Sequence, residues 1–426
     1  MESGHVAGGA MELVSELRAA PWVSRRASRM AHLADGGARD LAEIQEARKA
    51  CRDGAPGQRS ADAMRVFYAD LEREWRGGQS QAWLTLRGLG ERGHEVELLA
   101  ARDSPLANRV FEAGITVHQV PRFGLRVWAA RAMRSLIARG RFQVVHLNEP
   151  HALTAAWLAG THQRLPLLLS RRIGFPLQKN AVSQARYRAV ERFLANSKDV
   201  AKSLVDSGIA GERISIVNEG VEIFPLPTPE QRSNARKHWG VRENEFLFGC
   251  VSVFVPEKGH RHLIEALPLV RALHPEVRLL LAGDGACRAQ LEALAKRHGQ
   301  AQAVLFPGFV KDVAEVYAAL DAFAFPSEFE GLGTALQAAM AAGLPCISTK
   351  RGALGEVVDG DRTALVVEPN GKEFAEAILR LINDAVLRKQ LSEAGRREVQ
   401  ERFSAGRMVE NTIGVYQDVL EKTTPG

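Results

Sequence analysis

Residues 323–348 decide the fold, because FAFPSEFEGLGTALQAAMAAGLPCIS contains a strand, a glycine loop, a short helix and a second strand. The apolar run 322–325 stops at a proline and a serine, and residues 330–333, EGLG, supply a tight turn. Thr334 is a candidate cap for a helix that runs to Ala342, where a glycine and a proline end it. This order predicts a βαβ unit of a parallel sheet.

The glycine loop and the helix after it also predict a ligand. Loop glycines let a ligand approach the backbone closely. The first N–H groups of a helix have no partner within it and lie at its positive end, so they suit a diphosphate. Glu330 can accept hydrogen bonds from hydroxyl groups. An anion and a polyol together describe a sugar nucleotide.

The same stretch resembles the C-terminal signature of the retaining glycosyltransferases of family 4, E-G-x-G-(four residues)-E-A-M-A-x-G-x-P-V. The resemblance implies that the loop and helix start bind a nucleotide-sugar donor through Glu330, Gly331, Leu332, Gly333 and Thr334. It also implies that Glu330 lies near the donor sugar. The alternative for this stretch taken alone is an ordinary βαβ unit with a tight glycine turn.

The match departs from the family pattern at one functional position. The family has a second glutamate eight positions after the first, on the ribose hydroxyls, and this chain has Ala338 there. Gln337 is the nearest polar side chain, but one residue along a helix is a turn of about 100 degrees. The sequence therefore offers no carboxylate for the ribose hydroxyls at this position.

Length and composition indicate a globular protein of two domains. The chain has 426 residues, of which 46% are hydrophobic and 25% charged. No apolar run approaches the roughly 20 residues that span a bilayer. The four cysteines, Cys51, Cys250, Cys287 and Cys346, are scattered without metal-ligand spacing, which favours reduced thiols in the cytoplasm.

The first 63 residues differ from the rest of the chain. They are rich in Ala, Arg and Gly and contain no alternating apolar strand and no secretory signal core. We expect a helical or disordered appendage here, and family members typically start at a methionine placed like Met64. Residues 1–63 carry equal numbers of basic and acidic side chains, so the formal charge of +6 belongs to residues 64–426.

From Met64 onward strands and helices alternate, which predicts a doubly wound parallel sheet. Gly77 and Gly78 lie in the expected loop after the first strand. A glycine pair at this place and the sequence RGHEV at residues 92–96 are typical of the family's N-terminal domain. The resemblance implies that the glycine loop approaches the acceptor and the donor phosphates, and a plain turn is the alternative.

Polar side chains follow the buried strand at residues 143–147. Ligands of open α/β sheets bind at such carboxyl ends. The family often has H-x-H-(D/E)-P here, with the second histidine near the reacting carbon, and this chain has His146 and Asn148. Asn148 cannot titrate, so a proton-handling role would fall to His146 or His151, or be absent. The alternative is that His146 only makes a buried hydrogen bond.

A later strand ends in Arg171 and Arg172, a pair that suits a phosphate or carboxylate. The tract resembles a subset of the family with R-R-(apolar)-x-F-P before a helix. An acidic acceptor would be a natural partner for these arginines. A solvated arginine pair is the alternative.

The C-terminal half repeats the strand and helix alternation. Lys258 follows a buried strand, and the resemblance implies that it contacts the donor diphosphate as a point charge. The arginine that commonly accompanies it is absent, since Ser252 and Val253 occupy its place. The resemblance also brings donor contacts to three residues at later strand ends, namely Gly283, Phe309 and Val310.

Ordered matches extend from Met64 to about Tyr416, so the resemblance implies the GT-B architecture, two Rossmann-like doubly wound domains that face a central cleft. The predicted segments are an appendage, an N-terminal acceptor domain, a linker, a C-terminal donor domain and a returning helix, at residues 1–63, 64–224, 225–232, 233–397 and 398–426. We read residues 398–420 as one helix.

The implied activity is retaining transfer of a sugar from a UDP-, GDP- or ADP-sugar to a glycan or glycolipid acceptor, as in lipopolysaccharide or other cell-envelope synthesis. The residues implied in catalysis are Glu330, Lys258, His146 and Asn148. No metal is expected, because no Asp-x-Asp motif stands at a strand end and basic side chains can neutralise the diphosphate in place of Mg²⁺. The alternatives are a non-catalytic GT-B protein, a sugar phosphorylase or a nucleotide-sugar epimerase.

The net positive charge raises the question of further partners. We see no nucleic-acid recognition motif and expect no such partner. Residues 122–141 form a basic amphipathic stretch that could lie on the inner face of the membrane. The favoured alternative is that one face of this stretch packs on the sheet while its arginines are solvated.

Overall fold

The computed structural model describes residues 63–423. The predicted appendage, with Cys51, lies outside these residues except for Ala63. The other three cysteines are free thiols, and Cys250 and Cys346 are buried.

The N-terminal half contains a parallel sheet of seven strands in the order β3-β2-β1-β4-β5-β6-β7. Its strands are β1 (Arg65–Asp70), β2 (Glu95–Ala101), β3 (Thr116–Val120), β4 (Val144–Leu147), β5 (Leu167–Arg171), β6 (Arg192–Ala195) and β7 (Ile214–Ile216). Its helices are α3 (Gly77–Glu91), α4 (Pro105–Glu112), α5 (Leu125–Ile137), α6 (Pro150–Ala159), α7 (Ala181–Arg188) and α8 (Lys198–Asp206), with short 3-10 turns η1 (Thr161–Gln163) and η2 (Gly211–Arg213).

The C-terminal half contains a second parallel sheet, of six strands, in the order β10-β9-β8-β11-β12-β13. Its strands are β8 (Leu247–Val251), β9 (Arg278–Ala282), β10 (Val304–Gly308), β11 (Ala322–Phe325), β12 (Cys346–Ser348) and β13 (Leu365–Val366). Its helices are α9 (Pro229–His238), α10 (His260–Arg271), α11 (Arg288–Arg297), α12 (Val313–Ala319), α13 (Thr334–Ala341), α14 (Leu354–Val357), α15 (Gly360–Thr363), α16 (Gly371–Asn383) and α17 (Ala385–Arg402), with the 3-10 turn η3 (Pro256–Lys258).

The two sheets have the same topology, in which the fourth strand in sequence pairs with the first. The direction of winding therefore reverses between β1 and β4 and again between β8 and β11. Ligands of doubly wound sheets bind at the carboxyl ends of the strands beside such a switch point. The predicted α/β class with two doubly wound parallel sheets is confirmed.

Both faces of the N-terminal sheet are covered, because alternate residues of a strand point to opposite faces. Along β1, Val66 and Tyr68 belong to one apolar cluster and Phe67 and Ala69 to the other. A single larger cluster fills the C-terminal half. This double burial explains why the strands read as continuous apolar runs in the sequence.

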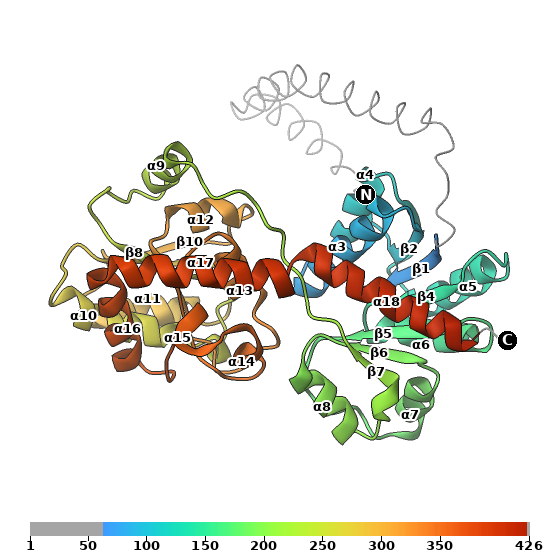
Figure 1. Ribbon diagram of the computed structural model, residues 1–426. Coiled ribbons are helices and arrows are strands. Elements are labelled where there is room, and N and C mark those ends of the chain that lie inside the picture. Colours follow the sequence, from blue (N-terminus) through green and yellow to red (C-terminus); the bar gives the residue numbers. More distant parts are fainter. Residues whose placement is uncertain (1–62, 424–426) are drawn as a thin grey trace, which may run out of the picture. The chain divides into compact units, whose positions relative to one another are not determined.

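The chain returns to the N-terminal half at its end, as predicted, but the segment predicted as one helix contains the end of α17 and the separate helix that makes the return. Helix α17 packs on α13, α15 and α16, whereas α18 (Ala405–Thr423) packs on α3 and adds Tyr416 to the N-terminal core (Figure 1). The prediction of one helix over residues 398–420 is wrong because the chain breaks at Phe403, whose side chain is buried in the C-terminal core. The backbone of Val221 pairs there with Phe403 and Ala405.

The segment predicted as a linker, residues 225–232, overlaps the first turn of α9. Thr228 caps this helix and Pro229 begins it, while Gln231 completes a capping box. The helix packs against α12 of the C-terminal half. The domain boundaries otherwise stay predictions.

Candidate active site

The glycine loop of residues 330–333 joins β11 to α13, as the sequence predicts. Gly333 has φ of +69° and is the N-cap residue, and a Cβ atom there would lie 2.6 Å from the Leu354 side chain. The expectation that Thr334 caps the helix is wrong, because Thr334 is already its first residue. A left-handed cap without a side chain leaves the helix N-terminus open to a ligand.

Lys258 and Glu330 meet at the carboxyl ends of the neighbouring strands β8 and β11. The Lys258 Nζ and Glu330 Oε2 atoms lie 2.5 Å apart, and both side chains are largely buried. The other Glu330 oxygen accepts a hydrogen bond from the Gly331 N–H. The sequence placed these two residues on separate motifs, and the fold brings them together at the switch point of the C-terminal sheet.

Close packing of backbone fixes the loops around this pair. Gly259 has φ of +65°, and a Cβ atom on it would lie 2.2 Å from the Pro326 carbonyl oxygen. A Cβ atom on Gly283 would lie 1.9 Å from the Ser252 carbonyl oxygen. The glycine at position 283 is thus required by packing against the loop after β8, whatever its role toward a donor.

The remaining residues predicted to bind the donor differ in exposure. Phe309 follows β10 with 80% of its surface exposed, and Val310 beside it is half-buried. Leu332 is buried in the C-terminal core, so only its backbone can reach a ligand. Gln337 is also buried, and its amide donates to the Leu332 carbonyl oxygen at 3.1 Å. Gln337 therefore does not take the place of the missing glutamate, and Ala338 offers no polar group.

In the N-terminal half, Gly77 and Gly78 form the first turn of α3 and not a loop. The Gln79 side chain accepts a hydrogen bond from the Arg76 N–H and so starts the helix before the glycines. No atom lies within 4 Å of a Cβ placed on Gly77. The expected loop is thus a glycine-lined helix N-terminus, which suits an anion for the same reason as α13 does.

His146 is buried with both ring nitrogens occupied. Nδ1 lies 2.5 Å from Tyr416 Oη of α18, and Nε2 lies 2.7 Å from Ser170 Oγ of β5. Burial, with a smaller contribution from the Arg172 charge, lowers the pKa of His146 to about 3. A neutral imidazole with a hydrogen bond to each ring nitrogen fits the alternative of a buried structural histidine. The geometry therefore does not support a proton-handling role.

Asn148 lies at the centre of a polar network in which each of its hydrogen-bonding groups has a partner. Its amide nitrogen donates to Asp70 Oδ2 at 2.5 Å and to the Gly78 carbonyl oxygen at 3.2 Å. Its oxygen accepts from Tyr68 Oη and from Arg172 Nη2, both at 2.8 Å. Only an amide can donate and accept in this pattern, so the asparagine links the start of α3 to β1 and β5.

Arg172 is ion-paired within the protein and is not a freely solvated arginine. Its Nε atom lies 3.1 Å from Glu219 Oε1, and Nη1 donates to the Asn148 carbonyl oxygen. Arg171 donates to the Phe175 carbonyl oxygen at 2.7 Å. Sequence reasoning missed Asp70 and Glu219 because their partners lie far away along the chain.

Glu149 is a further buried carboxyl group that the sequence did not single out. It caps α6, and its oxygens accept from the backbone N–H groups of Leu71, His151 and Ala152. Burial, and next the charge of Asp70, raises the pKa of Glu149 to about 8.

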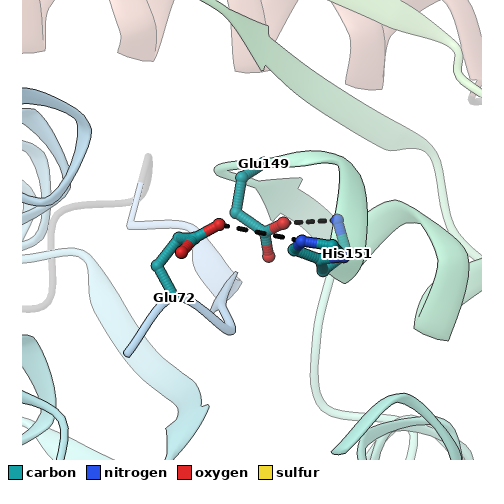
Figure 2. A group of neighbouring side chains, drawn as sticks. All are labelled: Glu72, Glu149 and His151. Carbon is teal, nitrogen blue, oxygen red and sulfur yellow. Dashed lines mark hydrogen bonds and ion pairs between the residues drawn. The ribbon is translucent and has the colours of Figure 1, made fainter. Parts of the chain in front are cut away.

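Glu149 lies beside Glu72 and His151, with their possible ligand atoms all within 4.8 Å of one another (Figure 2). His151 Nε2 is 3.9 Å from Glu72 Oε1, while Nδ1 is bonded to Arg126. The backbone N–H groups already engage both oxygens of the Glu149 carboxyl group, and Arg126 adjoins the histidine. The group is therefore a helix cap with a histidine beside it, and its donors do not favour a metal ion.

Two protein-family models match the chain, one in each half. Residues 75–223 match the model "Glycosyltransferase Family 4", and residues 231–398 match "Glycosyl transferases group 1". The N-acetyl-alpha-D-glucosaminyl L-malate synthase of Bacillus anthracis is 26% identical over 79% of this chain and 93% of that protein.

Two solved structures show the same fold. The structure of Anabaena Alr3699/HepE in complex with UDP and glucose has a TM-score of 0.72 and 20% identity, over 83% of this chain and 99% of that one. WaaG, a glycosyltransferase involved in lipopolysaccharide biosynthesis, has a TM-score of 0.61 and 18% identity, over 82% and 99% of the two chains.

Two Rossmann-like halves, with a lysine and a glutamate at the switch point of the second, define a glycosyltransferase of the GT-B class. The chain belongs to glycosyltransferase family 4, and the resemblance predicted from residues 323–348 is confirmed. Among residues 63–423, no helix is long and apolar enough to cross a bilayer.

Proposed function

We propose that the chain moves a sugar from a nucleotide-sugar donor to a glycan or glycolipid acceptor with retention of the anomeric configuration. The observation that carries the proposal is the contact between Lys258 and Glu330 beside the open N-terminus of α13. A cation and helix N–H groups suit a diphosphate, and a carboxylate suits sugar hydroxyls. A divalent metal is not part of the proposal.

Each group has a distinct task in this reaction. The bond between the sugar carbon and the diphosphate oxygen breaks, and the acceptor oxygen bonds to the same face of that carbon. The acceptor proton passes to the leaving diphosphate. Lys258 and the N–H groups at Gly333 and Thr334 stabilise the charge on that diphosphate, and Glu330 orients the sugar. In the structure Lys258 and Glu330 hold one another in place for these tasks.

The other predicted residues enter the proposal as supports. Gly77 and Gly78 present the N-terminus of α3 to the acceptor or the donor phosphates. The Asn148 side-chain amide holds this turn by donating a hydrogen bond to the Gly78 carbonyl oxygen. His146 holds α18 against β4 and β5. Neither of these two side chains has a hydrogen-bonding group left for the donor sugar, so we assign them positioning roles.

The identity of the donor is the finer part of the proposal. The Anabaena structure, which holds UDP and glucose, supports a UDP-sugar before a GDP- or ADP-sugar. Phe309, Val310 and the backbone near Gly283 are the groups we assign to the nucleotide. Because Ala338 supplies no carboxylate and Gln337 is buried, the ribose must depend on other groups or stay loosely held.

The same proposal includes the cell envelope as the destination of the product, with the enzyme in the cytoplasm and in peripheral contact with the inner face of the membrane. The relation to WaaG supports the envelope. Two exposed aromatic residues beside arginines support the membrane contact, namely Phe123 just before α5 and Trp128 in its first turn. The rival is a GT-B protein that binds a nucleotide sugar without turnover.

Hydrolysis of the donor tests retention and turnover together, because the anomer of the sugar that is released first reports the stereochemistry. We expect slow hydrolysis of one α-linked donor from a panel of UDP-, GDP- and ADP-glucose, with α-glucose seen before β-glucose by proton NMR. Lys258→Ala should lower this rate by about 100-fold or more, since it removes charge stabilisation of the leaving group. Lys372→Ala, at an exposed lysine on α16, is the control.

An initial excess of the β anomer would contradict retention. Absence of turnover in a protein shown to bind the donor would favour the non-catalytic rival.

A further inference from the structure

A basic pocket of about 530 Å³ lies at the carboxyl ends of β1, β3 and β4, wholly within the N-terminal half. The loop after β1, the start of α5 and His151 line it. β1 and β4 flank the switch point of the N-terminal sheet, which is where a doubly wound sheet binds ligands. The pocket therefore has the position of a substrate site and is separate from Lys258 and Glu330.

Arginines dominate the charge of this pocket. Four of them, Arg73, Arg76, Arg122 and Arg126, face two carboxylates, Glu72 and Glu74. Arg76 is paired with Glu74 at 2.5 Å. Within residues 63–423 the other three arginines form no ion pair.

Neutral acceptors hold these three guanidinium groups in position. Arg73 Nη2 donates to the Arg122 carbonyl oxygen at 2.5 Å. Arg122 donates to the Arg102 and Asp103 carbonyl oxygens at 3.0 and 3.1 Å. Arg126 Nη2 lies 2.7 Å from His151 Nδ1. Each guanidinium has five N–H donors, so these contacts orient the group and leave donors and charge for a ligand.

The buried carboxyl group behind the pocket does not cancel this charge. Glu149 is held by three backbone N–H groups, and its raised pKa keeps it largely protonated at neutral pH. Burial, and next Arg126, lowers the pKa of His151. The arginines oppose a divalent cation at Glu72 and His151 and favour an anion.

We propose that this pocket binds an anionic group of the acceptor, a phosphate or a carboxylate, through Arg73, Arg122 and Arg126. The inference rests on the proposed function and deepens it by naming the acceptor's class. Guanidinium forks match the two oxygens that both anions present. Of the pair that the sequence favoured for an acidic acceptor, Arg172 is already ion-paired with Glu219, and neither Arg171 nor Arg172 lines this pocket.

Calorimetric titration of the full chain tests the site, with inorganic phosphate, glycerol 3-phosphate and L-malate as separate probes. We expect at least one probe to bind at millimolar concentration or below, and to bind about tenfold more weakly or worse to the double variant Arg122→Gln/Arg126→Gln. The control is Arg131→Gln/Arg139→Gln, which removes the same charge from exposed positions outside the pocket. The probes separate a phosphate from a carboxylate.

Anion binding at the donor site is recognised by repeating the titrations with Lys258→Ala, which should not change them. Failure of all three probes with folded protein would overturn the proposal, and so would equal weakening in the control pair. A wild-type chain that binds a probe through Arg122 and Arg126 but binds no nucleotide sugar would refute the proposed function and leave the anion pocket standing.

Discussion

The roles of several side chains in this protein depend on partners that lie far away in the sequence. Asn148 replaces a family histidine, and its four hydrogen bonds to Tyr68, Asp70, Gly78 and Arg172 explain why an amide is needed there. The sequence shows the replacement but not the partners. Glu149 illustrates the same limit, since nothing near it in the chain indicates that Asp70 lies beside it.

Glu149 should make stability depend on pH. Its pKa is about 8 in the folded chain and its ordinary value is 4.5, so the folded state holds a proton that the unfolded state releases. Stability is therefore lost as pH rises from about 4.5 to about 8. We expect Glu149→Gln to flatten this fall in unfolding temperature by at least about 2 °C between pH 5 and pH 8, measured by calorimetry.

Glu74→Gln removes a carboxylate from an exposed side chain of the loop after β1 and serves as the control for Glu149→Gln. It should leave the pH dependence unchanged. Equal slopes in wild type and Glu149→Gln would show that Glu149 ionises normally in the folded protein.

At the scale of elements, tight backbone contacts position the donor loops. Gly259 and Gly299 have nearly the same left-handed φ, +65° and +69°, but only Gly259 faces a backbone oxygen, that of Pro326. Gly299→Ala should cost about 1 kcal/mol of unfolding free energy, the strain of the left-handed conformation. Gly259→Ala should cost at least about 2 kcal/mol more and weaken donor binding, because the loop after β11 must move.

Denaturant unfolding of both glycine variants measures the difference, and donor titration measures the effect on the site. Similar losses of stability in Gly259→Ala and Gly299→Ala would show that the contact with Pro326 relaxes at no cost.

Elements also show how far sequence reasoning reaches. The central strands were predictable because they are apolar runs buried on both faces, whereas the edge strands β3 and β7 are largely exposed or half-buried. Lys258 and Glu330 were predictable from the motifs that contain them. The break between α17 and α18 was missed, although Ser404 is an N-cap signal whose Oγ accepts a hydrogen bond from the Arg407 N–H. The break also depends on backbone contacts of Val221 with Phe403, Ser404 and Ala405, which are distant in the sequence. The helical position of Gly77 was missed because glycines usually indicate a loop.

At the scale of the whole molecule, the proposed membrane contact depends on one exposed surface at the start of α5. Phe123, just before the helix, is 92% exposed and Trp128 is 48% exposed, whereas Met133 and Leu136 of α5 are buried in the apolar core. We expect the full chain to sediment with phosphatidylglycerol vesicles, and Phe123→Ser/Trp128→Ser to reduce the bound fraction severalfold. Phe111→Ser, at an exposed phenylalanine on α4, is the control.

Failure of the wild-type chain to bind these vesicles at any salt concentration would remove the membrane from the account. The exposed arginines of residues 122–141 would then be solvated, which is the alternative predicted from the sequence.

Donor binding through Lys258 is the central claim for the molecule. Calorimetric titration of the full chain with UDP-, GDP- and ADP-sugars should find micromolar binding of one donor. That binding should be lost in Lys258→Ala and kept in Lys372→Ala. Failure of every donor to bind folded protein, or unchanged binding in Lys258→Ala, would contradict the assignment of the donor site to Lys258 and Glu330.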